Sequence, residues 1–191
     1  VKLPIFVARQ WVRHRTARLN EISGRYSVMK DEFYVPTPET LRTQSDVNKQ
    51  GRSEETLSEE DARAVVQGLA AGQAEAYARY EAMLEKNLAR EVARIGLPLS
   101  LYTEWYWQMD LNNLFRFLKL RLDAHAQWEI RQYARVIADL TRAVAPLAYA
   151  AFERHVLSAV TLSSESARWL KSRLEGQGDL PKEVRAKLGM E

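Results

Sequence analysis

The chain has 191 residues, of which 46% are hydrophobic and 28% are charged, as in an ordinary globular domain and unlike a disordered segment. Its formal net charge of +3 permits an anionic ligand but is too small for a dedicated duplex-DNA binder. The absence of cysteine excludes disulfides, thiolate zinc sites and a cysteine nucleophile. No apolar run is long enough to span a bilayer and no signal peptide is recognisable, so we expect a cytoplasmic protein with no membrane contact. We also expect no metal site.

The first residues predict a strand that continues into a helix. Residues 1–5 are compatible with the end of a strand, and Pro4 suits the first turn of a helix that runs through Trp11 toward His14. Residues 34–57 are mostly polar and contain two prolines and a glycine, which predicts a long exposed loop.

From residue 58 onward the pattern is helical almost to the end of the chain. Ser58 precedes three acidic residues in a capping pattern, and apolar residues then recur on one face as far as Leu84. Asn87 is a plausible helix stop. Further helices are predicted over residues 89–95, 99–109, 112–122, 124–144, 147–157 and 162–174, followed by a glycine-rich break and a charged tail over residues 176–191.

Residues 13–25 concentrate groups that bind anions. Arg13, Arg15 and Arg25 provide guanidinium forks that suit a phosphate or a flavin pyrophosphate. Ser23 and Gly24 can bring backbone N–H groups close to a phosphate oxygen. The alternative is a solvated basic surface or loose contact with nucleic acid, and composition alone leaves both open.

Arg121 lies on the apolar stripe of its predicted helix, at a position where a core residue is expected. Leu114, Phe117 and Leu118 precede it by seven, four and three residues on that stripe. Its methylenes could instead reach the surface, or its charge could pair with a buried carboxylate. The nearby His125 likewise fits a satisfied core group or a catalyst.

The order of the residues in the basic segment resembles the signature of the flavin-dependent thymidylate synthases. Arg13-His14-Arg15 is followed after seven residues by Ser23 and then by Gly24-Arg25-Tyr26-Ser27. Residues 1–12, 93–98 and 110–131 resemble further segments of that family, so matching segments extend from Val1 to about Ala134. Because the chain opens on Val1 within this pattern, we expect a preceding segment to be missing.

The resemblance implies a reaction, its cofactors and an assembly. It implies conversion of dUMP to dTMP with 5,10-methylenetetrahydrofolate as carbon donor, NADPH as reductant and FAD as the carrier between them. It also implies a homotetramer with active sites shared between subunits. A flavin-based route fits a chain without cysteine, because the other class of thymidylate synthase attacks the uracil ring with a thiolate.

The resemblance also implies roles for individual residues. Arg121 is the expected catalytic residue, because a fixed cation beside N3 of the pyrimidine stabilises the anion and raises electron density at C5. Expected FAD contacts are Arg13, His14, Arg15, Glu21, Asp110, Leu111, Asn112 and Arg116. Expected dUMP contacts are Gln10, Trp11, Val12, Arg13, Glu21, Ile22, Ser23, Gly24, Arg25, Arg94 and Arg121. Asp110 and Arg116 depart from the residues common in the family, and Arg18 is larger than the small residue expected there.

The predicted elements and the resemblance together indicate an α+β fold that is mainly helical, with a small antiparallel sheet from the N-terminal part and one domain over residues 1–191. Two alternatives stay open. One is a helical nucleic-acid-binding module that uses the arginines on phosphates and Trp11 or Tyr26 for base stacking. The other is a non-catalytic, truncated relic of the family that folds and oligomerises without activity.

Overall fold

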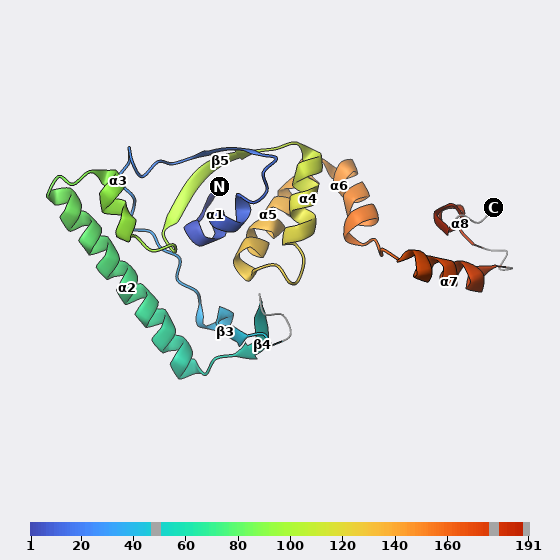
Figure 1. Cartoon of the computed structure of the whole chain (residues 1–191), viewed down its shortest axis with the longest axis horizontal. Coiled ribbons are helices and arrows are strands. Elements are labelled where there is room, and N and C mark those ends of the chain that lie inside the picture. Colours follow the sequence, from blue (N-terminus) through green and yellow to red (C-terminus); the bar gives the residue numbers. More distant parts are fainter. Residues whose placement is uncertain (47–50, 176–179, 189–191) are drawn as a thin grey trace. The chain divides into compact units, whose positions relative to one another are not determined.

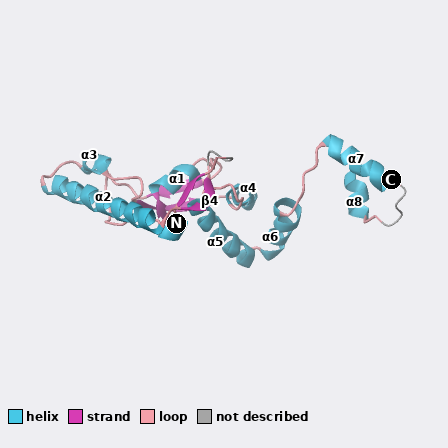
Figure 2. Cartoon of the chain, turned by 90° about the horizontal axis from the view of Figure 1, so that it is seen from below, coloured by secondary structure: helices cyan, strands magenta, loops and turns pink. Residues whose placement is uncertain are grey.

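The structure is a computed structural model that describes residues 1–46, 51–175 and 180–188 (Figure 1). The chain divides into two compact units, Val1–Ala145 and Pro146–Glu191. All described strands belong to the first unit, and helices predominate in both (Figure 2). The predicted α+β class is confirmed, whereas the single domain over residues 1–191 stays a prediction. None of the described helices is long and apolar enough to cross a membrane.

The described residues of the first unit contain five strands and most of the helices. Its strands are β1 (Lys2–Pro4), β2 (Arg18–Glu21), β3 (Arg42–Gln44), β4 (Arg52–Thr56) and β5 (Tyr102–Gln108). Its α-helices are α1 (Ile5–Trp11), α2 (Glu59–Glu85), α3 (Arg90–Ala93), α4 (Leu111–Arg121) and α5 (Trp128–Val144), and its short 3-10 helices are η1 (Pro38–Thr40) and η2 (Arg94–Gly96). The predicted passage from a strand directly into a helix at Pro4 is confirmed.

The central strand β5 corrects a prediction, because a helix was expected over residues 99–109. β5 pairs antiparallel with β1 on one side and β2 on the other, with Leu3 opposite Thr103 and Glu21 opposite Trp105. Its burial alternates, since Thr103 and Trp105 are buried and their neighbours are more exposed. A period of two and the aromatic and β-branched side chains in the strand favour β structure. The helix predicted over residues 99–109 is therefore wrong, because this run has the period of a strand.

The core of the first unit forms around the fully buried Trp11 at the end of α1. Its ring meets Trp105 and Trp107 of β5 edge to face, at centroid distances of 5.8 and 5.1 Å. Phe117 of α4 and Tyr133 of α5 lie 4.9 and 5.8 Å away. Figure 1 shows α1 between β5 and these two helices. The Trp11 cluster thus fixes the end of α1, where the basic segment starts.

Helix α2 begins and ends where the sequence predicts. The Ser58 hydroxyl accepts a hydrogen bond from the Asp61 N–H at 3.1 Å, and Asn87 adopts a positive φ of 56° just beyond the helix. Two tyrosines of α2 bind the backbone of Met29. The Tyr77 hydroxyl donates to the Met29 carbonyl at 3.0 Å, and the Tyr80 hydroxyl accepts from the Met29 N–H at 3.1 Å. The helix therefore fastens the segment that follows the basic motif.

The predicted loop over residues 34–57 is wrong in part, because it contains η1 and an antiparallel hairpin of β3 and β4. Residues 47–50, which also fall in the predicted loop, lie outside the described residues. Both strands are short and polar, with Arg42 opposite Thr56 and Gln44 opposite Arg52. The apolar alternation that identifies a half-buried strand is absent from them.

Every described secondary-structure element of the second unit is a helix. It consists of α6 (Pro146–Phe152), a π-helical turn η3 (Glu153–Leu157), α7 (Ser164–Leu174) and α8 (Lys182–Leu188). The predicted helices over 147–157 and 162–174 correspond to α6 with η3 and to α7. Helix α8 falls within the predicted tail, whereas the predicted break at residues 176–178 lies outside the described residues.

Candidate functional site

The basic segment starts in a tight turn at the end of α1. The N–H groups of Val12, Arg13 and His14 donate to the carbonyls of Ala8, Gln10 and Trp11, so the helix unwinds within one turn. Val12, Arg13 and Arg15 are exposed while His14 is half-buried. The turn therefore presents two guanidinium groups outward and one imidazole inward.

The predicted catalytic residue contacts this imidazole. Nε of Arg121 donates a hydrogen bond to Nε2 of His14 at 3.0 Å, and the His14 ring lies edge to face with Phe117 at 4.8 Å. Burial, followed by the charge of Arg121, lowers the pKa of His14, which keeps its Nε2 lone pair available as the acceptor. Burial also lowers the pKa of Arg121, but an arginine starts so high that it stays charged.

Helix α4 positions Arg121. Asp110 caps the helix by accepting from the Asn113 N–H at 2.9 Å, and hydrogen bonds from Asn113 lower the pKa of the Asp110 carboxyl. Phe117 and Leu118 are buried on the face that leads to Arg121 one turn later. The arginine thus extends from a packed face, with its head half-buried.

The largest of the described cavities, about 1280 Å³, lies between the β3–β4 hairpin and the connection from α4 to α5. Its lining includes Gln10, Arg52, Arg121, His125 and Gln127. His125 is exposed rather than part of the core, and its Nδ1 lies 2.8 Å from Oδ1 of Asp123. We call this cavity the first cavity. Two predicted nucleotide contacts, Gln10 and Arg121, both line it.

A buried carboxylate that the sequence analysis did not single out lies beside the first cavity. Glu129, in the first turn of α5, is 4% exposed. Its Oε1 accepts from Nη2 of Arg52 and from the Tyr34 hydroxyl at 3.0 Å, and its Oε2 accepts from Nε2 of Gln127 at 2.8 Å. Oε1 of Gln127 accepts in turn from Nε2 of Gln10. The pKa of Glu129 would rise through burial, but these hydrogen bonds, Arg52 foremost, lower it on balance.

The sequence of residues 110–131 gives only a weak indication of the hydrogen-bond network around Glu129. A glutamate in the first turn of a helix is common, because it complements the helix dipole. Arg52 lies on the β3–β4 hairpin, where the sequence predicts a loop, and the sequence does not indicate Glu129 as its partner. The buried carboxylate considered as a partner for Arg121 does exist, but it binds Arg52 instead.

A second group of predicted nucleotide contacts surrounds a cavity of about 340 Å³, lined in part by Glu21, Ser23, Gly24, Arg25 and Arg94. Gly24 leaves little room for a side chain here, since a Cβ at this position would lie 3.0 Å from Sδ of Met29 and 3.1 Å from Cδ of Arg94, and those side chains would have to shift. Glu21 accepts from the Thr103 hydroxyl at 2.5 Å. Ile22 is exposed beside it.

Two further contacts in this second group bear on the predicted roles of its residues. The Ser23 hydroxyl accepts from the Arg25 N–H at 3.3 Å, a turn contact that gives it no general base. Nε of Arg25 donates to Oε2 of Glu91 at 2.9 Å, and both side chains are about half exposed. Such an exposed pair is weak, so a phosphate can replace Glu91 as the partner.

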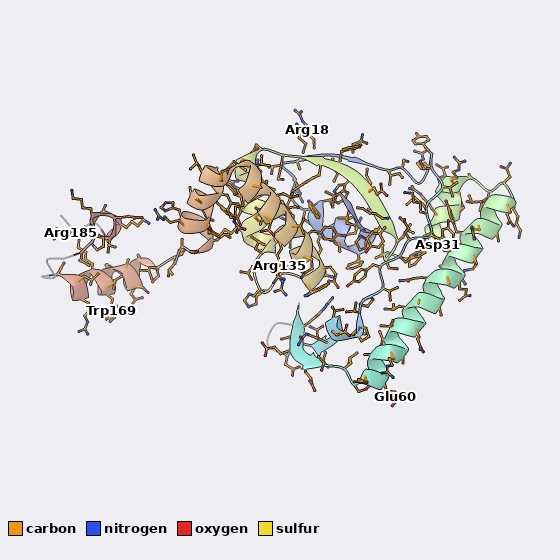
Figure 3. All side chains as sticks on the ribbon, turned by 180° about the vertical axis from the view of Figure 1, so that it is seen from behind. Arg18, Asp31, Glu60, Arg135, Trp169 and Arg185 are labelled. Carbon is orange, nitrogen blue, oxygen red and sulfur yellow. The ribbon has the colours of Figure 1, made fainter. Side chains whose placement is uncertain are left out.

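A third group collects predicted flavin contacts. Arg15 and Asp110 both line a cavity of about 530 Å³ at the start of β2 and the end of β5. Leu111, Asn112 and Arg116 are exposed on the adjacent α4. Arg18 also lines this cavity and extends away from the ribbon (Figure 3).

The three groups line separate cavities of the chain. Trp11 differs from the other predicted contacts, because its side chain is fully buried in the core and only its backbone is left for a nucleotide. The roles assigned to all of these residues remain predictions.

No group of three or more His, Cys, Asp or Glu side chains suited to a metal ion occurs in the described part of the chain.

Comparison with known proteins decides the family. The family model described as thymidylate synthase complementing protein matches residues 1–147. The chain belongs to this family. A flavin-dependent thymidylate synthase from Treponema denticola is 56% identical over 177 residues, which cover 93% of this chain and 66% of the relative. Another from Thermus thermophilus is 58% identical over 174 residues, covering 91% of this chain and 62% of the relative.

A solved structure supports the same assignment at the level of fold. The UMP/dUMP methylase PolB from Streptomyces cacaoi, in a crystal structure bound with 5-Br UMP, superposes with a TM-score of 0.74 and 31% sequence identity. The match covers 80% of this chain and 70% of that chain. The chain spans about three fifths to two thirds of the length of the curated relatives named above.

Proposed function

We propose that this chain is part of a flavin-dependent thymidylate synthase that converts dUMP to dTMP, with FAD as cofactor and with NADPH and 5,10-methylenetetrahydrofolate as co-substrates. The observation that carries the proposal is the Arg121–His14 pair at the first cavity, in a family member whose 191 residues here contain no cysteine. The relatives named as flavin-dependent thymidylate synthases support it.

The role of Arg121 follows from its surroundings. Because His14 accepts from Nε, the two terminal nitrogens of Arg121 are left to face the first cavity, which Arg121 lines with Gln10. A guanidinium held beside N3 of uracil favours loss of the N3 proton and makes C5 more nucleophilic, so no enzyme thiolate is needed. Partial burial strengthens this effect relative to water.

The nucleotide phosphate is assigned to the second group. Arg25 and Arg94 supply charge there, and Gly24 allows Arg94 to pack against the backbone. Because this group and the Arg121 group line different cavities, we propose that a second copy of the chain completes each site in a homotetramer. Exposed apolar side chains support an assembly, since Tyr106 of β5 and Val144 of α5 are 84% and 85% exposed.

The flavin is assigned to the turn after α1 and the start of α4. Arg13 and Arg15 are exposed, and within the described residues no ion pair neutralises either of them, which fits a pyrophosphate. The cavity of about 530 Å³ beside Arg15 and Asp110 gives room for part of such a group. When bound, FAD supplies the hydride-transfer chemistry that connects NADPH oxidation to reduction of the transferred carbon.

The purified full-length protein tests the proposal and separates it from the alternatives. A yellow solution that oxidises NADPH only when dUMP and the folate are supplied supports the enzyme. A colourless, folded protein with no turnover, even with dUMP and FAD added, refutes it and favours the relic. Salt-dependent affinity for single-stranded DNA without flavin binding would instead favour the nucleic-acid-binding module.

A further inference from the structure

The buried carboxylate beside the first cavity has no part in the proposed chemistry, yet it controls the direction of a hydrogen-bond chain. An ionised carboxylate has no hydrogen to donate, so Glu129 can only accept. Gln127 must therefore turn its Nε2 toward Glu129, which directs its Oε1 toward Gln10. The Gln10 amide must then use its own Nε2 for this bond.

The consequence for the first cavity is an amide of fixed orientation. With one N–H of the Gln10 Nε2 committed to Gln127, the amide keeps its Oε1 turned toward a ligand as the acceptor. An uncharged partner in place of Glu129 could donate as well as accept, and both amides could then rotate. One buried charge thus selects one of two otherwise similar arrangements.

We propose that Glu129 is a positioning residue of the nucleotide site, which acts through Gln127 to present the Gln10 carbonyl oxygen to an N–H or O–H donor of the pyrimidine nucleotide. This inference rests on the proposed function. The competing explanation is purely structural, because Glu129 also anchors Arg52 of the β3–β4 hairpin. The test must separate the two roles.

Two variants make this separation in the full chain loaded with FAD. Glu129→Gln removes the negative charge that fixes the orientation of the two amides, but it also leaves Arg52 without its buried charged partner. Gln127→Met breaks the chain to Gln10 while the ion pair of Glu129 and Arg52 stays intact, so it remains informative even when Glu129→Gln fails to fold. Each folded variant should raise the Kd for dUMP about tenfold in calorimetry, with flavin content unchanged.

Tyr34→Phe is the matched control, because it removes a hydrogen bond to the same carboxylate without touching the chain to Gln10. Its Kd for dUMP should stay within about twofold of the wild type. A tenfold loss in this control would support the structural explanation and overturn the proposal.

A double-mutant cycle gives a readout that a structural role would not produce. If Gln127 acts through Gln10, then Gln127→Met should have no further effect in a Gln10→Ala background. The same loss in both backgrounds, or an unchanged Kd in Gln127→Met, would overturn the proposal. Failure of the wild-type chain to bind dUMP and flavin would instead remove the proposed function itself, and this inference with it.

Analogues of the nucleotide identify the donor. The wild type and Gln127→Met should bind equally well to the analogue that lacks the group recognised by Gln10. N3-methyl-dUMP tests the base and the 3′-deoxy analogue tests the sugar. A tenfold difference that persists with both analogues would contradict the assigned contact.

Discussion

Replacing Arg121 by alanine tests the electrostatic role of this side chain. Two unit charges about 4 Å apart interact by about 4 kcal/mol at an effective dielectric constant of about 20, which corresponds to roughly a thousandfold in rate. Arg121 is only half-buried, so solvent screens part of this interaction. Loss of a preorganised donor at a developing charge typically costs about 100- to 1000-fold in kcat. We expect a loss in that range, with FAD still bound.

Two further substitutions sharpen this experiment. Arg121→Lys keeps a charge but loses the Nε donor to His14 and the planar fork, so its loss should be smaller, about tenfold. Lys119→Ala is the control, because Lys119 is exposed on the same helix and lines none of the three cavities described above. The assay is dUMP-dependent NADPH oxidation. Turnover of Arg121→Ala within about threefold of the wild type would refute the role.

The remaining predictions concern pH, packing and stability. Because burial and Arg121 lower the His14 pKa below 6.5, stability should fall as the pH drops from 6.5 toward the folded pKa, and His14→Gln should flatten this part of a urea-unfolding series. Gly24→Ala should weaken dUMP binding about tenfold by displacing the adjacent arginine, whereas Gly96→Ala, whose Cβ meets nothing within 4 Å, should not; equal affinities would refute this. Trp11→Ala should lower the free energy of unfolding by about 3–5 kcal/mol, and a loss below about 1 kcal/mol would contradict the central packing of this ring.

The sequence identified features that depend on local patterns. Ser58 and Asn87 bound helix α2 because a capping hydroxyl and a left-handed asparagine act within a few residues of the chain. The basic segment was recognised from the order of its residues, and its position at the end of a short helix followed from Pro4 and Trp11. These signals are readable because their partners are close in sequence.

The features that were missed depend on distant partners. Residues 102–108 form a strand because β1 and β2, some eighty or more residues earlier, provide the hydrogen bonds on both sides. The importance of Glu129 depends on Arg52 and Tyr34, which lie 77 and 95 residues away. Pairing over such separations leaves no periodic trace in one sequence, and a glutamate early in a helix has an ordinary local explanation.

The seven residues between Arg15 and Ser23 include strand β2, which pairs residue by residue with β5. From Arg18 to Glu21 the chain advances about 10 Å at a rise of about 3.4 Å per residue, and successive side chains alternate between the two faces of the sheet. An insertion or deletion of one residue here would turn Glu21 away from Thr103 and send every later side chain of the segment to the opposite face. Changes of length in this segment should therefore be far more damaging than changes of residue type at its exposed positions.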